Sequence, residues 1–256
     1  MLSKKTTALL AALLTLVLFN SARAADSPSV VEGFGCNFQG DNDFDDLDRV
    51  NDYYVNQIAK INSPGLNKMG SVLWIPFRGN VAVDFVWINT NITLAEWGEA
   101  AMAAEGSPVG QDIDEKWSEV ATCSGSGLAA SEAIFSTDSE FKDDGEVLIQ
   151  SFRCNLHPGM TIADTDKAIA AWRPVFKKAV RGTGANSVVF RRTPIVSGNG
   201  FDLTYAAVWD DPAAYATTQS AFLSDPDNAK SGQLFAAAHR CESAMFRGRV
   251  IKPWNN

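Results

Sequence analysis

The sequence has few of the residues on which enzymes most often rely. Its 256 residues include two histidines, His157 and His239, and four cysteines. No Ser-His-Asp set, glycine-rich phosphate loop or Cys-x-x-Cys pair is present, and no spacing of cysteine and histidine is typical of a zinc site. The sequence therefore predicts no metal centre, and nothing in it indicates a cofactor.

Basic residues are also scarce. Lysine and arginine number 22 against 30 aspartate and glutamate residues, which gives a formal net charge of −8. Three of the basic residues, Lys4, Lys5 and Arg23, lie in the first 24 positions, and without that segment the charge becomes −11. A protein this acidic is expected to repel nucleic acid and anionic lipid, so neither is a predicted partner.

Long apolar runs are missing except at the N-terminus. Residues 8–19 are apolar, follow two lysines and precede the small-x-small sequence Ala22-Arg23-Ala24. The run is about a dozen residues, shorter than the roughly 20 that span a bilayer, so it predicts a cleaved signal peptide over 1–24. The alternative is an uncleaved anchor. We expect a periplasmic or secreted protein with no membrane segment after cleavage.

The remaining chain repeats itself once, with an offset of 118 residues and no gap. Cys36 corresponds to Cys154 and Cys123 to Cys241. Other identities at the same offset are Asp46/Asp164, Asp48/Asp166, Lys60/Lys178, Pro76/Pro194, Asp84/Asp202 and Pro108/Pro226. The pattern predicts a duplicated domain. The expected boundaries are a first repeat over 25–137, a polar linker over 138–145 and a second repeat over 146–256.

The repeat also limits how the cysteines pair. Export favours disulfides, and four cysteines permit three connectivities. The pairs Cys36–Cys123 and Cys154–Cys241 are favoured, because only pairing within a repeat treats both copies alike and lets each close on itself. A structural role is the interpretation, rather than a redox role.

The order of elements within a repeat is easiest to follow in the second copy. Thr161 with Asp164 predicts a capping box, as Asp43 with Asp46 does in the first copy. Pro174 is expected to kink the helix that follows or to begin its second half. The predicted elements are strand 146–154, a helix ended by Gly182 and Gly184, strand 187–195, strand 201–209, helices over 212–223 and 227–239, and strand 241–251. Each copy is thus predicted to have the order β-α-β-β-α-β. This is the ferredoxin-like plan, in which strand four lies beside strand one.

Two segments carry a family resemblance. CNLHPGMTIADTD, followed by a helix, a hairpin and VWDDPAAYATTQSAFLSDPD, resembles the dimeric α/β-barrel superfamily, and most closely its antibiotic-biosynthesis-monooxygenase-like members. The resemblance implies an α+β fold in which two ferredoxin-like units pack sheet against sheet. Here one chain would supply both units, as two tandem ferredoxin-like repeats packed as a pseudo-dimeric α/β barrel.

Three residues are candidates for catalysis. Asp84 and Asp202 each stand in an apolar run that predicts a strand, where a carboxylate is costly unless it is paired. Such a group can serve as a general base, can form a structural pair with an arginine, or can occupy an edge position that faces water. Their occurrence in both copies favours the structural role, with Arg153 or Arg192 as the partner of Asp202. The third candidate is His239.

A second set of residues is predicted to bind a ligand: Trp74, Phe85, Trp87, Arg153, Arg192 and Tyr205. The aromatic residues indicate a pocket for a flat apolar molecule, or ordinary core. Arginines on strands can hold a carboxylate or phosphate, or can balance an acidic surface. Some members of the superfamily degrade haem with a histidine, an asparagine and a tryptophan. Asn155 and His239 are present here, but no matching tryptophan is evident.

The sequence leaves two functions open. The first is an exported protein that binds a small apolar or aromatic ligand or serves as an interaction domain. The alternative, implied by the resemblance, is a cofactor-independent monooxygenase or isomerase. Fold alone does not decide between them, because one architecture hosts many chemistries.

Overall fold

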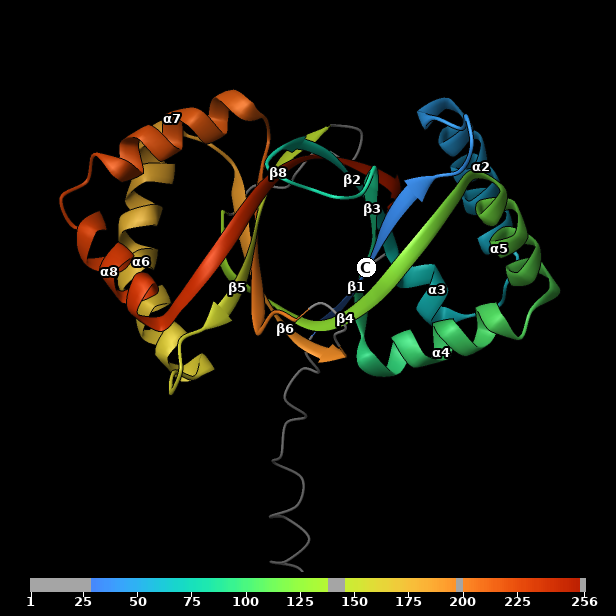
Figure 1. Cartoon of the computed structure of the whole chain (residues 1–256), viewed down its shortest axis with the longest axis horizontal. Helices are drawn as coiled ribbons and strands as arrows, with labels where there is room; N and C mark the ends of the chain where they lie inside the picture. The colour runs from blue at the N-terminus through green and yellow to red at the C-terminus, as the bar shows by residue number, and fades with distance from the viewer. Residues whose placement is uncertain (1–28, 138–145, 197–199, 254–256) are drawn as a thin grey trace, which may run out of the picture.

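The computed structural model describes residues 29–137, 146–196 and 200–253. The predicted signal peptide and the predicted linker lie outside these residues. Within them are eight strands and seven helices (Figure 1). In chain order they are β1 (Ser29–Phe38), α2 (Phe44–Ile58), α3 (Pro64–Lys68), β2 (Gly70–Arg78), β3 (Phe85–Thr93), α4 (Leu94–Glu105), α5 (Pro108–Val120), β4 (Ala121–Ser136), β5 (Val147–Leu156), α6 (Ile162–Thr183), β6 (Ser187–Val196), β7 (Leu203–Trp209), α7 (Pro212–Leu223), α8 (Asn228–Ala238) and β8 (His239–Lys252).

The strands close into one antiparallel barrel in the order β1-β3-β2-β8-β5-β7-β6-β4. The first half of the chain supplies β4-β1-β3-β2, and the second half supplies β8-β5-β7-β6, with corresponding strands in the same order. The halves join where β2 pairs with β8 and where β4 pairs with β6. Figure 1 shows α2 to α5 on one side of the barrel and α6 to α8 on the opposite side. The predicted α+β class and barrel are confirmed.

Both predicted disulfides are present. Cys36–Cys123 joins β1 to β4, and Cys154–Cys241 joins β5 to β8, each with a sequence separation of 87 residues. In both ladders the two cysteines lie directly opposite each other. The expectation that strand one and strand four meet at the cysteines is therefore confirmed.

The helix starts follow the local sequence. Asp43 with Asp46 and Thr161 with Asp164 both form capping boxes. The hydrogen bond from Lys167, together with those from Thr161, lowers the pKa of Asp164 to about 2. The capping interpretation of the repeated Asp46 and Asp164 is confirmed.

The first helical segments of the two halves differ. α6 continues past Pro174 to Thr183 and ends at Gly184, whose φ of 69° is the left-handed conformation that glycine adopts easily. The expected restart at Pro174 does not occur. The first half instead breaks into α2 and α3, because Ser63 caps a new helix with Pro64 in its first turn.

The apolar core has three parts. One lies between each half of the sheet and its own helices, and the third fills the barrel with residues of both halves. In that third cluster, the rings of Trp74 and Phe246 lie 5.5 Å apart. The halves are also linked by charge, because Arg249 on β8 pairs with Asp48 on α2. Among the helices that the structure describes, none is both long and apolar enough to cross a membrane.

Candidate functional site

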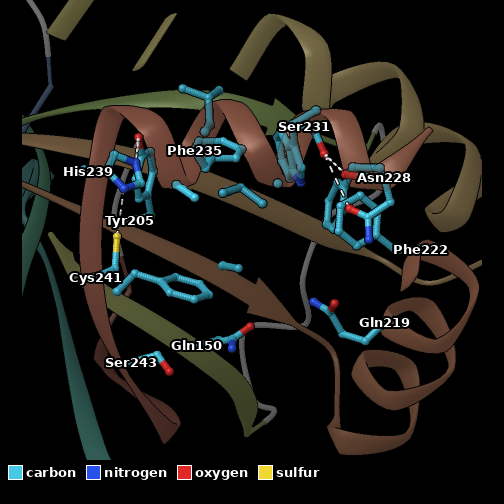
Figure 2. Close-up of a pocket in the computed structure, with 18 of the residues that line it drawn as sticks. Gln150, Tyr205, Gln219, Phe222, Asn228, Ser231, Phe235, His239, Cys241 and Ser243 are labelled. Atoms are coloured by element: carbon cyan, nitrogen blue, oxygen red, sulfur yellow. Dashed lines mark hydrogen bonds between the residues drawn. The ribbon is translucent and has the colours of Figure 1, made fainter. Parts of the chain in front are cut away.

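A cavity of about 520 Å³ lies in the second half, between the outer face of the sheet and helices α6, α7 and α8 (Figure 2). Its lining combines aromatic rings with a few polar side chains: Ile134, Gln150, Phe152, Trp172, Phe176, Val189, Tyr205, Ala207, Trp209, Gln219, Phe222, Asn228, Ser231, Gly232, Phe235, Ala236, His239, Cys241 and Ser243. A cavity of this size and composition is typical of small-molecule sites.

The walls are mostly aromatic. Trp172 and Phe176, one turn apart on α6, stack with ring centroids 4.4 Å apart, because residues four positions apart share a helix face. Figure 2 places Phe235 on α8 between two ends of the cavity, with Tyr205 and His239 at one end and Phe222 and Gln219 at the other. The arrangement is a mainly apolar slot, with Tyr205 and His239 at one end and with Gln150 and Ser231 between the two ends.

The polar end near β8 is built around His239. Its Nδ1 lies 3.2 Å from Cys241 Sγ, and its Nε2 lies 3.3 Å from the hydroxyl oxygen of Tyr205. A disulfide sulfur carries no hydrogen, so in the neutral ring the contact with sulfur places the hydrogen on Nδ1. Nε2 then accepts a hydrogen bond from the Tyr205 hydroxyl.

Burial keeps both groups uncharged. His239 is 6% exposed, and burial lowers its pKa below the usual value of 6.5. Burial also raises the pKa of Tyr205 to about 12. Desolvation disfavours the charged form of each group, so the pair is neutral at neutral pH. The Nε2 lone pair is therefore available as a proton acceptor.

One further polar group in the lining lacks a partner. The indole N–H of Trp209 is buried, and it has no hydrogen-bond partner among the described residues. A buried donor without a partner is costly, at roughly 1–3 kcal/mol. A ligand oxygen in the cavity is one way to satisfy such a donor.

The first half carries core residues at the corresponding positions. Trp117 and Trp87 occupy the places of Phe235 and Tyr205, and their rings meet edge to face at 4.8 Å. Ile113 stands where the second half has Ser231, and Ala121 stands where it has His239. The first half thus has larger rings and an aliphatic side chain where the second half has cavity-lining residues.

Helix packing contributes to the same difference. A Cβ on Gly110 of α5 would collide with the carbonyl oxygen of Ala104 at the end of α4, so α5 approaches α4 closely because residue 110 is glycine. The second half has Asn228 at that position, and Asn228 lines the cavity. Asparagine excludes the same close approach.

The structure corrects the expectation for Asp84 and Asp202. Both were expected in the middle of strands, either paired or facing water at an edge; both are exposed, and they lie just before β3 and β7. Asp84 accepts a hydrogen bond from the Phe38 amide at 2.9 Å, and Asp202 accepts one from the Leu156 amide at 2.8 Å. The expected ion pair of Asp202 with Arg153 or Arg192 is not formed. Each carboxylate instead holds the end of the neighbouring strand, β1 or β5.

Of the residues predicted to bind or react with a ligand, Tyr205 and His239 line the cavity. Phe85 and Trp87 are buried in the first-half core, and Trp74 lies inside the barrel. The Arg192 guanidinium lies 5.0 Å from the Trp74 ring, and burial lowers the pKa of Arg192 to about 10. The Arg153 guanidinium stands 5.3 Å from the ring of Phe201. These five residues are not part of the cavity lining.

Sequence reasoning missed most of the cavity, including Gln219, Phe222, Asn228, Ser231 and Phe235 on α7 and α8. A signal was present in the repeat. At two of these positions the second copy replaces residues that pack closely in the first, with Asn228 for Gly110 and Ser231 for Ile113. Such substitutions indicate loosened helix packing.

The residues considered for haem do not fit that group. While the Cys154–Cys241 disulfide is intact, Nδ1 of His239 contacts Cys241 Sγ and Nε2 contacts the Tyr205 hydroxyl, so neither nitrogen is open to a haem iron. Asn155 is exposed and lies opposite Arg240 in the β5–β8 ladder. Because Arg240 is the residue next to His239, the side chains of Asn155 and His239 point to opposite faces of the sheet.

No protein-family model and no curated protein sequence matches the chain. Solved structures do match it in fold. A putative monooxygenase from Fusobacterium nucleatum is 12% identical, with a TM-score of 0.55 over 90% of this chain and 96% of that one. An anthrone oxidase-like protein is 12% identical, with a TM-score of 0.55 over 89% and 95%. A putative chlorite dismutase is 9% identical, with a TM-score of 0.54 over 88% and 95%.

These structures share the barrel and its helices with the chain over nearly all of their length. The predicted resemblance is thereby confirmed for the fold, whereas identities of 9–12% leave the activity open. The chain has the dimeric α/β-barrel fold, with both halves of the barrel supplied by a single polypeptide.

Proposed function

We propose that the protein binds one small, largely apolar, ring-containing molecule in the second-half cavity. The observation that carries this proposal is the cavity of about 520 Å³ between the second half of the sheet and its helices, at the place where the first half has the packed rings of Trp87 and Trp117. A gap in a core costs stability, because its lining loses contacts. Its aromatic walls suit a flat ligand, and the unpaired indole N–H of Trp209 suits a ligand oxygen.

The test is native mass spectrometry of protein purified from its source, followed by rebinding of the molecule that co-purifies. Ser231→Ile places the first-half residue in the cavity and is expected to abolish rebinding. Gln233→Ile, on the exposed side of the same helix, is the matched control and should leave rebinding intact. Equal rebinding by both variants would argue against this cavity as the site.

A second candidate function is oxidation of the bound molecule without a cofactor, or its isomerisation. It is favoured by the Tyr205–His239 pair, which supplies a neutral proton acceptor next to an apolar slot. The names of the neighbours that match in fold, a monooxygenase and an anthrone oxidase-like protein, favour this function over passive binding.

The chemistry begins with a methylene group that a neighbouring carbonyl makes acidic. Tyr205 accepts the C–H proton while its own hydroxyl proton passes to Nε2 of His239, which leaves a delocalised carbanion. In the oxidase case, molecular oxygen then takes electrons from the carbanion. The net change is CH₂ + O₂ → C=O + H₂O. In the isomerase case, the proton returns at another carbon of the conjugated system.

Anthrone is the probe for the oxidase, with oxygen uptake as the readout. Tyr205→Phe and His239→Gln are each expected to slow uptake by about 100-fold, a typical contribution of a positioned acid or base. His157→Gln is the control, because the second histidine is not part of the cavity lining. Uptake that is absent in the unmodified protein, or unchanged in both cavity variants, would leave binding as the function.

Two further proposals concern the chain as a whole. The halves are tandem ferredoxin-like repeats, supported by their shared order of elements, and the protein is exported, supported by residues 1–24 and by the two disulfides. Because β2–β8 and β4–β6 pairing already closes the barrel, a monomer is expected in solution. Light scattering that gave only dimers at micromolar concentration would contradict this expectation.

A further inference from the structure

The Cys154–Cys241 disulfide lies beside His239 at one end of the cavity. The ligand atoms of Cys154, His239 and Cys241 all lie within 4.8 Å of one another. Cys154 and His239 are buried, whereas Cys241 is half-buried and lines the cavity. Figure 2 shows the sulfur of Cys241 facing the His239 ring. While the two sulfurs are bonded to each other, neither is a thiolate, so the cluster holds no metal ion in this state.

We propose that reduction of this disulfide creates a site for a borderline-soft metal ion of the Zn²⁺ class, held by both thiolates and by Nδ1 of His239. A phosphine or dithiol supplies two electrons, and the two sulfurs take up two protons as the S–S bond breaks. The metal ion then displaces those two protons and binds the thiolates. Thiolate sulfur and imidazole nitrogen are the ligands that Zn²⁺ prefers.

The existing geometry is close to what such a site requires. Tetrahedral Zn²⁺ with Zn–S bonds of about 2.3 Å holds two sulfurs roughly 3.8 Å apart. The sulfurs must therefore separate by side-chain rotation after reduction, while the three ligand atoms already lie within 4.8 Å. Three protein ligands leave a fourth position open, and two of the three, Cys241 and His239, line the cavity. An open fourth position is the arrangement of zinc sites that bind a water or a substrate.

Tyr205 contacts the ring nitrogen of His239 that does not bind the metal ion. When the metal occupies Nδ1, the ring hydrogen moves to Nε2, which then donates to the Tyr205 hydroxyl oxygen now 3.3 Å away. Metal-bound histidines generally donate their other N–H to a fixed acceptor, which orients the ring. Tyr205 is thus a positioning residue for the metal site.

The first half is an internal control. Cys36 and Cys123 form the corresponding disulfide, but Ala121 stands where the second half has His239. Reduction there yields two thiols without an imidazole. The site is therefore expected in one half only, and it does not depend on which ligand the cavity takes.

The experiment uses the full mature chain, reduced with a phosphine under nitrogen and titrated with Zn²⁺ against a chromophoric chelator. One tight site per chain is expected, with none in the oxidised protein. Alkylation followed by peptide mapping should show that Zn²⁺ protects Cys154 and Cys241 but not Cys36 and Cys123. Co²⁺ in place of Zn²⁺ should give a thiolate charge-transfer band.

Histidine variants separate this site from general thiol binding. His239→Ala should weaken Zn²⁺ binding at least about tenfold, since loss of an outer-shell partner alone costs 10–100-fold. His157→Ala, the other histidine, should bind as the unmodified chain does. Equal protection or equal exposure of all four cysteines, as in a chain that unfolds on reduction, would overturn the proposal. So would unchanged affinity in His239→Ala, or equal binding by the oxidised protein.

Discussion

The two halves of the barrel share one plan and differ in how tightly their helices close on the sheet. The strands β1 and β5 have the same length and the same pattern of burial, residue by residue. The helices do not match in this way. In the first half, Gly65 and Gly110 let α3 and α5 approach α4 until no side chain fits between them. In the second half, Thr183 and Asn228 stand at these positions.

The comparison shows where two halves with the same order of elements can differ. A strand that pairs on both sides is held by its ladder, so its residues keep their pattern. A helix contacts the sheet through side chains alone, so a few substitutions move it away and leave space. In the second half, Thr183 bonds to Thr218 between α6 and α7, which replaces close backbone packing with a side-chain contact at 2.8 Å. The cavity is the consequence.

Removal of a disulfide should give the largest effect, and the effect should be equal in both halves. Each disulfide has a sequence separation of 87 residues, and the loop-closure estimate for that length is about 4–5 kcal/mol. We expect Cys36→Ala/Cys123→Ala and Cys154→Ala/Cys241→Ala to lower the free energy of unfolding by similar amounts in urea. A much smaller loss in one pair would show that the halves unfold independently.

Alanine in place of a helical glycine should change stability in opposite directions in the two halves. Gly110→Ala forces a Cβ against the Ala104 carbonyl and is expected to cost about 3 kcal/mol through overpacking. Gly232→Ala, on α8, meets nothing within 4 Å and is expected to add about 0.5–1 kcal/mol through helix propensity. Thermal unfolding measures both. Equal shifts in the two variants would contradict the difference in packing.

A buried tyrosine of the first-half core should make the free energy of unfolding fall as the pH rises above 10. Tyr54, which corresponds to Trp172 of the cavity, is 7% exposed, and its burial raises its pKa from 10.0 to about 12. The unfolded chain loses this proton above pH 10 while the folded chain keeps it, so stability falls between pH 10 and 12. The total loss is about 2–3 kcal/mol.

Tyr54→Phe should flatten that part of the stability profile relative to the unmodified protein. Trp172→Phe in the cavity carries no titrating group and is the control for a ring change at the corresponding position. Profiles of Tyr54→Phe and the unmodified protein that stay parallel up to pH 12 would show that Tyr54 titrates normally.

The smallest expected effects concern Asp84 and Asp202, which occupy corresponding positions in the two halves. Asp84→Ala and Asp202→Ala each remove one hydrogen bond that a backbone amide donates to an exposed carboxylate, and each should cost about 1 kcal/mol. The halves should respond alike, because the contact is the same in both. A loss of several kcal/mol in Asp202→Ala alone would instead support the ion pair with Arg153 or Arg192 that the sequence suggested.

Much of the fold was predictable because its signals are local or repeated. Capping residues such as Asp43 and Thr161 act within one helical turn, and the duplicated cysteines indicate which strands are neighbours. The position of Asp202 was not predictable in the same way. Its apolar neighbours indicate a strand, but the strand begins only at Leu203, because the carboxylate bonds the amide at the end of β5.

The candidate site was predictable only in part. Tyr205 and His239 were singled out, but nothing in their local sequence brings them within 3.3 Å of each other. Phe85 and Trp87 were singled out for their aromatic character, which is the same for a core residue and for a pocket residue. Whether rings touch each other or line a space depends on how far the covering helices lie from the sheet.

The sequence by itself determined the order of the elements, the helix caps and the disulfide pairs, because these follow from short-range hydrogen bonding and from the repeat. Only the tertiary structure decided which half keeps a cavity and which residues face it. Helix-to-sheet distance is set by many side chains acting together, such as Gly110 in one half and Asn228 in the other, so its effect becomes visible only when the halves are packed.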